Sequence, residues 1–352
     1  MWAMIVKEFL ELRRDKRTVA MIVVLPLVLL VVFGYAASFN VESISTQVVG
    51  PQAQQTAAQL RDPFEVDKVD PAATEAAARD RLRDGDAAVV VVTGAGTPKA
   101  LVDGSRLFSA QAAVAETARM QGQLRTEVLY NPELKTSWVM VPALIGMILA
   151  FIGTIITSIG LVRERQAGTL EQLAVMPFRP SDVIAGKIVP YFVLAAVDMA
   201  VVAVVGRLLF DVPFNGSVLT FILGGTLFLF AVLGIGVLIS TVSENQGQAT
   251  QLALMTMLPQ ILLSGMIFPL ESMAIGVRWI GYVLPLTYFI QVSNGTMLRG
   301  APIATLWLPL TVLACMAALV FIGAVLRFRR DLAPSQPQAK DSETDQQPVG
   351  AR

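Results

Sequence analysis

The chain has 352 residues, of which 54% are apolar and 15% are charged, and its mean hydropathy is +0.62. Because an ordinary soluble domain is about 45–50% apolar and about 25% charged, this composition predicts an integral membrane protein. The net charge is zero, so nucleic acid is not expected as a partner, and the absence of histidine excludes zinc sites, Ser-His-Asp catalysis and histidine proton relays. The single cysteine, Cys315, excludes an intrachain disulfide.

The first 37 residues predict a helix on the membrane surface followed by a helix that crosses the membrane. Residues 1–17 mix basic side chains with an apolar face that includes Trp2 and Phe9, which favours an interfacial amphipathic helix on the cytoplasmic side. A frayed basic leader is the alternative. Residues 18–37 carry no charge, and Tyr35-Ala36-Ala37 fits a signal-peptide cleavage site poorly, so we expect a retained first span.

Residues 38–137 differ in composition from the rest of the chain, because acidic residues outnumber basic ones and the apolar runs are short. Segments typical of strands and helices alternate along this stretch, which predicts a small extracytoplasmic α/β domain inserted between the first and second spans. We expect strands at residues 46–50, 64–69, 87–92 and 100–103, and helices at residues 52–60, 72–83 and 109–129.

Five later runs are nearly free of charge and long enough to cross a ~30 Å hydrocarbon core, so the chain is predicted to be an α-helical membrane protein with six spans. The five spans are expected at residues 138–162, 183–209, 217–241, 248–270 and 303–326. Asp198 is the one acidic residue within them, and it is predicted to contact a polar side chain of a neighbouring helix or to lie on a substrate pathway. The polar tail, residues 327–352, is expected to be disordered and cytoplasmic.

Residues 271–300 are apolar, but charged, amide and proline residues interrupt them. A seventh span here would place the basic C-terminal tail opposite the basic N-terminus, against the positive-inside rule. We therefore predict a re-entrant segment that enters and leaves the outer leaflet. Pro269, Glu271, Pro285 and Tyr288 are its candidate outer-gate residues.

Residues 163–182 join the second and third spans by a short charged connector, predicted to lie in the cytoplasm with both termini. The chain contains no phosphate-binding loop of the type Gly-x-x-x-x-Gly-Lys-Ser/Thr, so it is expected to bind no nucleotide cofactor itself. Its spans offer Asp198 alone as an acidic group, which argues against a proton- or sodium-coupled carrier. Any transport would then need a partner that supplies energy.

The connector sequence Arg-Glu-Arg-Gln-Ala-Gly-Thr-Leu-Glu-Gln-Leu at residues 163–173 resembles the cytoplasmic connector of type-2 ATP-binding-cassette (ABC) exporter permeases. Two further runs, residues 263–273 (Leu-Ser-Gly-Met-Ile-Phe-Pro-Leu-Glu-Ser-Met) and 284–289 (Leu-Pro-Leu-Thr-Tyr-Phe), resemble the same family. The run Tyr-Asn-Pro-Glu-Leu at residues 130–134 resembles the subgroup with a large extracellular domain between the first two spans.

The resemblance implies two permease protomers, identical or homologous, that dock on two separate ATPase subunits, which bind the ATP and Mg²⁺. It assigns coupling to the ATPase to eight residues of the connector, which are Arg163, Glu164, Arg165, Gly168, Thr169, Leu170, Glu171 and Leu173. For the two arginines, a role as positive-inside anchors is the alternative interpretation.

The function expected from this resemblance is that of a non-enzymatic permease subunit of an exporter in a bacterial cytoplasmic membrane. Because a cavity lined by these spans would be almost free of charge, the expected substrate is an amphipathic or hydrophobic molecule such as a drug, an antibiotic or a lipid-like compound, with membrane lipid as a further partner. A membrane-anchored sensor with a ligand-binding external domain is the alternative, and a secondary carrier is a weaker one.

Overall fold

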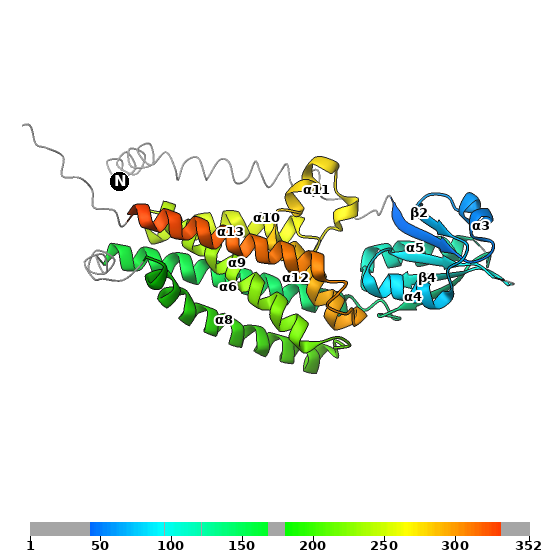
Figure 1. Cartoon of the computed structure of the whole chain (residues 1–352), viewed down its shortest axis with the longest axis horizontal. Helices are drawn as coiled ribbons and strands as arrows, with labels where there is room; N and C mark the ends of the chain where they lie inside the picture. Colours follow the sequence, from blue (N-terminus) through cyan, green and yellow to red (C-terminus); the bar gives the residue numbers. More distant parts are fainter. Residues whose placement is uncertain (1–42, 95, 121, 168–179, 332–352) are drawn as a thin grey trace, which may run out of the picture.

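The computed structural model describes residues 43–94, 96–120, 122–167 and 180–331, which form an α/β domain attached to one end of an elongated helix bundle (Figure 1). We call the end of the bundle that carries this domain the domain end, and the opposite end the far end. The expected surface helix (residues 1–17), the expected first span (18–37) and the tail beyond residue 331 lie outside the described residues.

The α/β domain contains a five-stranded mixed sheet with the strand order β2-β1-β3-β4-β5. β1 pairs in parallel with β2 and β3, β3 pairs antiparallel with β4, and β4 pairs in parallel with β5. The strands are β1 (Ile44–Val49), β2 (Phe64–Asp70), β3 (Val89–Val92), β4 (Lys99–Asp103) and β5 (Arg125–Leu129). The central strand β3 consists of valine alone because apolar cores cover both faces of the sheet.

Helices cover both faces of this sheet. The helices are α3 (Ala53–Gln59), α4 (Glu75–Asp84) and α5 (Leu107–Arg119). Val89 and Val91 belong to the core cluster under α3 and α5, whereas Val90 belongs to the cluster under α4. Because successive side chains of a strand point to opposite faces of the sheet, the valines of β3 contribute alternately to the two cores.

The expected helix at residues 109–129 is wrong in its second half. Helix α5 ends at Arg119, and Arg125–Leu129 form β5, which pairs with β4 along its whole length. The sequence of β5, Arg-Thr-Glu-Val-Leu, has little intrinsic preference for a strand, so pairing with β4 decides its conformation. Helix α4 begins at Glu75, later than expected, because the Thr74 side chain caps it by accepting a hydrogen bond from the Ala77 amide.

Five long helices run along the bundle (Figure 1), namely α6 (Thr136–Gln166), α8 (Pro180–Phe210), α9 (Val218–Val242), α10 (Gln246–Leu263) and α13 (Trp307–Asp331). Among the described residues, four segments are long and apolar enough to cross a membrane: Thr136–Gln166, Val189–Phe210, Val218–Val242 and Trp307–Ala324. Helix α9 lies at the centre and packs most extensively against α13 and α6. Helix α8 leaves a broad apolar side exposed.

The expected fifth span, residues 248–270, is too long at its C-terminal end. Helix α10 ends at Leu263, Ser264 caps it, and Gly265 adopts a left-handed conformation with φ 89°. A side chain with a Cβ atom is strained in that conformation, so glycine provides a favourable place for the chain to leave the helix. The chain then continues to the short 3₁₀ helix η1 (Leu270–Ser272).

The segment between α10 and α13 leaves and rejoins the bundle at the domain end (Figure 1). It contains α11 (Ile275–Gly281), α12 (Pro285–Asn294) and a π-helical turn, η2 (Gly295–Arg299), and the helices on either side of the break are bent by 77°. Helix α12 inserts among the long helices, where Phe289 stacks on Phe228 of α9 with ring centroids 4.7 Å apart. If this bent pair counts as one span, the described residues contain five candidate spans.

Candidate functional site

The far end of the bundle carries the first part of the predicted connector. Arg163, Glu164, Arg165 and Gln166 form the last turn of α6, where the two arginines are favourably placed against the negative end of the helix dipole. Arg163 is exposed, and Glu164 and Arg165 are partly buried. The other candidate coupling residues, Gly168, Thr169, Leu170, Glu171 and Leu173, lie outside the described residues.

The turn between α9 and α10 is bonded directly to this end of α6. Arg165 Nη1 donates to the carbonyl oxygen of Ser243 at 3.2 Å, and Gln166 Nε2 donates to that of Glu244 at 3.5 Å. Gln246 Nε2 donates to Gln166 Oε1 at 3.3 Å. We call these five residues, together with Arg163, the far-end surface: Arg163, Arg165, Gln166, Ser243, Glu244 and Gln246. The surface joins three long helices.

Side-chain caps fix the conformation of the α9–α10 turn. Asn245 Oδ1 accepts a hydrogen bond from the Gln248 amide at 2.9 Å, and Gln248 Oε1 accepts one from the Glu244 amide at 3.0 Å. This reciprocal arrangement resembles a capping box. Sequence reasoning treated the turn only as a weakly charged connection. Its signal was Asn245 followed three residues later by Gln248, directly before an apolar run.

Asp198 lies on α8 beside Ala195 and Met199, which both belong to the main core of the bundle. Its carboxylate is partly buried, and its Oδ2 atom is enclosed. The predicted hydrogen bond to a serine, threonine or glutamine of a neighbouring helix is not seen, because Oδ2 has no hydrogen-bond partner among the described residues. Asp198 Oδ2 is thus enclosed by protein without a hydrogen-bond partner among the described residues, and a role of Asp198 in a substrate pathway stays a prediction.

The four candidate outer-gate residues lie in two separate places. Pro269 is buried before η1 and Glu271 is exposed, and both line a cavity beneath the α/β domain. Pro285 occupies the first turn of α12, where its missing amide hydrogen costs no bond. Tyr288 donates a hydrogen bond to the Tyr282 carbonyl oxygen at 2.7 Å, so it holds α12 to the end of α11.

A chain of ion pairs connects the α/β domain to the segment between α10 and α13. Arg299 Nη1 lies 3.6 Å from Asp103 Oδ2, and Arg106 Nε lies 3.8 Å from the same atom. Arg106 Nη1 also lies 3.7 Å from Glu271 Oε1. Asp103 is fully buried, and its other oxygen accepts hydrogen bonds from the Ser105 amide and hydroxyl. Sequence reasoning missed Asp103, Arg106 and Arg299, since nothing local indicates that they meet.

The run at residues 130–134 anchors the α/β domain to α6. Burial, together with the charge of Asp103, raises the pKa of Tyr130 to about 12, so its hydroxyl stays neutral and donates to the Arg79 carbonyl oxygen at 3.2 Å. Asn131 is fully buried, and its amide group bonds the carbonyl oxygen and the backbone amide of Lys135. Hydrogen bonds of Tyr130 and Asn131 therefore fix the connection between the α/β domain and α6.

The family described as ABC-2 family transporter protein matches residues 16–326, which is most of the chain. This chain belongs to the ABC-2 transporter family. It is a type-2 ABC permease and a multi-pass membrane protein, as the connector sequence predicted.

Several relatives of this ABC-2 permease are bacterial permeases. The chain is 33% identical over 201 residues to the probable multidrug ABC transporter permease YbhR of Escherichia coli, a match that covers 57% of this chain and 55% of YbhR. It is 34% identical over 212 residues to the inner membrane transport permease YhhJ of E. coli, covering 59% of this chain and 56% of YhhJ. The chain thus spans about half the length of the relatives it matches.

A eukaryotic relative is ABC transporter G family member 20 of Dictyostelium discoideum, which is 27% identical over 204 residues, or 57% of this chain and 28% of that protein. All these relatives are named as permeases or ABC transporters.

Among the residues that the structure describes in this ABC-2 permease, no group of three or more histidine, cysteine, aspartate or glutamate side chains is placed to hold a metal ion.

Proposed function

We propose that this ABC-2 permease is the membrane subunit of an ATP-driven exporter in a bacterial cytoplasmic membrane, energised by separate ATPase subunits. The far-end surface is the observation that carries the proposal. A force applied to residues 163–182 would act on α6 and, through the bonds of Arg165 and Gln166 to the α9–α10 turn, on α9 and α10 as well. A surface that joins three long helices suits a docking site for an ATPase.

The proposed topology has six spans, with both termini and residues 163–182 in the cytoplasm and residues 38–137 outside. Arg163 and Arg165 at the far end agree with the positive-inside rule for this orientation. Residues 271–300 are the proposed re-entrant segment of the outer leaflet, and an external α/β domain would agree with the corresponding subgroup of the family.

The proposed assembly contains two permease protomers, identical or homologous, and two ATPase subunits that bind ATP and Mg²⁺. The permease itself binds no cofactor. An amphipathic or hydrophobic substrate is supported by the names of two E. coli relatives, which are probable multidrug permeases. It is also supported by the main core of the bundle, whose buried cluster is apolar.

A sensor is the second candidate function, and the ion pairs of Asp103 favour it. The Arg299–Asp103 and Arg106–Glu271 pairs connect the α/β domain to the segment between α10 and α13, so a ligand that moved the domain would also move this segment. A sensor would bind its ligand without net transport. Transport measurements therefore separate the two candidates.

The test is ATP-driven uptake of an amphipathic fluorescent cation, ethidium, into inverted membrane vesicles that contain the permease and its ATPase. Uptake is expected only with both subunits and ATP, and vesicles with the permease alone are the matched control. Uptake that an imposed proton gradient drives without the ATPase would contradict the exporter and support a secondary carrier. Absence of uptake under every condition, with ethidium bound, would favour the sensor.

A further inference from the structure

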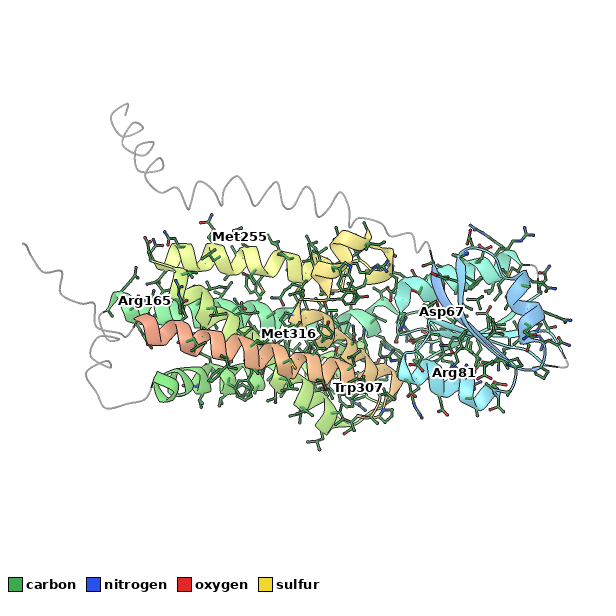
Figure 2. The ribbon with its side chains drawn as sticks, turned by 45° about the horizontal axis from the view of Figure 1, so that its top comes forward. Asp67, Arg81, Arg165, Met255, Trp307 and Met316 are labelled. Carbon is green, nitrogen blue, oxygen red and sulfur yellow. The ribbon has the colours of Figure 1, made fainter. Side chains whose placement is uncertain are left out.

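A cavity of about 470 Å³ lies between the α/β domain and the domain end of the bundle. This volume is within the range of about 300–1,000 Å³ typical of small-molecule sites. Residues from seven segments line it: the α4–β3 turn, the start of α5, α6, the α10–η1 turn with η1, α12, the end of η2 and the start of α13. Figure 2 shows Trp307 at the end of α13 nearest the α/β domain.

The bundle side of the cavity is mostly apolar. Its apolar lining residues include Val139, Met140, Met266, Ile290, Leu306 and Trp307. Trp307 is 62% exposed, so its indole ring is open to a ligand. Aromatic faces attract organic cations, and methionine side chains adapt to irregular apolar groups. This wall suits the apolar body of an aromatic cation.

Three lining side chains carry polar atoms that are buried and have no hydrogen-bond partner among the described residues. They are Ser264 Oγ, Asn294 Oδ1 and Arg299 Nε. Ser264 is 1% exposed and the Arg299 side chain is 9% exposed. Buried polar groups in proteins are almost always hydrogen-bonded, so these three indicate that polar groups of a ligand or water complete the site.

The charges around the cavity leave a negative excess. Arg299 and Arg106 are neutralised by Asp103 and Glu271. Asp84 lies 3.5 Å from the Arg83 guanidinium.

Asp86 lines the cavity, is exposed, and forms no ion pair with any residue that the structure describes. Its carboxylate is therefore the group left to attract a cation at the rim of the cavity. An anionic ligand would find both guanidinium charges already paired with carboxylates and would meet Asp86 as it entered.

We propose that this cavity is a binding site for amphipathic organic cations, with the apolar body of the ligand against Trp307 and its positive charge toward Asp86. The chemistry of this site indicates the class of molecule that the proposed exporter carries, so the role of the site in transport rests on the proposed function. Binding itself does not depend on the ATPase. The site lies at the end of the bundle where an exported molecule would leave.

The experiment is a titration of the purified full chain, in detergent and without the ATPase, with ethidium. Binding is read as a saturable rise in ethidium fluorescence. Asp86→Lys should weaken binding by about five- to tenfold, since it replaces a favourable charge with a repulsive one. Thr305→Trp places a bulky side chain in the lining and should abolish binding. An anionic probe, anilinonaphthalene sulfonate, should not compete in the unchanged protein.

Two matched variants control for non-specific effects. Glu65→Lys makes the same charge reversal at an exposed position of β2, and Ile303→Trp adds the same bulk at an exposed position outside the lining. Both should bind ethidium as the unchanged protein does. Equal affinity in all four variants would overturn the cavity assignment, and so would effective competition by the anion. The exporter proposal is judged separately, by ATP-driven uptake with and without the ATPase.

Discussion

Arg299 and Asp103 form a buried ion pair between the helix bundle and the α/β domain, with Nη1 and Oδ2 3.6 Å apart and side-chain exposures of 9% and 0%. Asp103 ends β4, and Arg299 ends the π-helical turn before α13. A charge that is buried and then loses its partner is much more costly than a pair that is absent altogether. Together with the Arg106–Glu271 pair, this contact joins the α/β domain to the bundle.

Arg299→Leu should lower the free energy of unfolding by about 3–5 kcal/mol, the usual cost of leaving a buried charge without its partner. Arg106 lies 3.8 Å from the same Asp103 oxygen and will retain part of the stability. Thermal unfolding of the purified chain measures the effect. Arg125→Leu is the control, because Arg125 is exposed on β5 and forms no ion pair with a described residue.

The double variant Arg299→Leu with Asp103→Leu provides the decisive comparison. Removal of both charges should recover much of the stability lost in the single variant, since no unpaired charge remains. A double variant less stable than the single one by the full cost of Asp103→Leu would show that the two residues do not interact energetically.

Gly85→Ala should destabilise the same junction. Gly85 ends α4 in a left-handed conformation with φ 84°, and a Cβ atom there would lie 2.5 Å from Arg299 Nη1. The left-handed backbone alone costs a non-glycine residue about 1–2 kcal/mol, and the contact would displace Arg299 as well. Gly94→Ala is the control, because a Cβ atom there meets nothing within 4 Å. Equal melting temperatures for the two variants would contradict the prediction.

Four apolar helices long enough to cross a membrane and most strands were predictable because their signals are local. A charge-free run such as residues 217–241 can only be buried in protein or lipid, and the valine run of β3 requires two apolar faces. The segment 271–300 forms a bent pair of helices in the structure, and its re-entrant topology stays a prediction from the positive-inside rule. In each case the evidence lies within a short window of sequence.

The missed features depend on partners distant in sequence. The strand β5 forms because β4 is available to pair with it, which its own residues do not indicate. Asp103 and Arg299 meet through the docking of a domain on a bundle, and the cavity beside them has walls from seven segments. The bond between Arg165 and Ser243 likewise joins residues 78 positions apart. Composition and periodicity do not indicate such contacts between residues distant in sequence.

Acid should destabilise the α/β domain. Hydrogen bonding to Lys99 lowers the pKa of Glu127, bonding to Arg79 lowers that of Glu75, and bonding to Arg81 lowers that of Asp70. A lowered carboxylate pKa stabilises the folded state above the ordinary value of about 4.5 for glutamate, and this stability is lost as the pH falls through the lowered value.

Unfolding of the domain should therefore be independent of pH from about 7 to about 5 and become easier below about pH 4. Hydrogen exchange of the β-sheet amides in the full chain, corrected for the intrinsic effect of pH, measures this. Glu127→Gln should reduce the pH dependence, since it removes one titrating partner. An increase in stability on acidification would reverse the predicted sign.

Replacement of Asp198 tests whether its carboxylate is needed for folding and membrane insertion. Because Oδ2 has no hydrogen-bond partner among the described residues, neither Asp198→Asn nor Asp198→Leu strands a polar neighbour. A charge inside a bilayer costs about 2.5–3.5 kcal/mol on insertion scales, so we expect both variants to insert and fold at least as well as the unchanged chain. Membrane yield after gel filtration tests this, and a lower yield for the leucine variant alone would indicate a polar partner.

The far-end surface yields the prediction that bears most directly on mechanism. Arg165→Ala removes the bond to the Ser243 carbonyl oxygen while leaving the body of α6 unchanged. Hydrogen bonds from charged groups contribute about 1.5–3 kcal/mol, and about 1.4 kcal/mol corresponds to a tenfold change in rate. We therefore expect ATP-driven uptake to fall about tenfold at matched membrane levels, because less of the force on the connector would reach α9 and α10 through the α9–α10 turn.

Leu170→Asp, in the connector beyond the described residues, should instead weaken co-purification of the ATPase. It places a charge on an apolar residue to which the family resemblance assigns coupling, and an apolar contact with the partner would then have to bury that charge. The two variants thus separate docking of the ATPase from transmission of force to the bundle. Leu170→Asp should weaken ATPase binding, whereas Arg165→Ala should keep ATPase binding and lower transport. Arg207→Ala is the matched control, since Arg207 is an exposed arginine in the last turn of α8. If Arg165→Ala transports as Arg207→Ala does, the bond to Ser243 does not transmit force, and coupling must reach the bundle through the other contacts of α6, including the bonds of Gln166 to the α9–α10 turn.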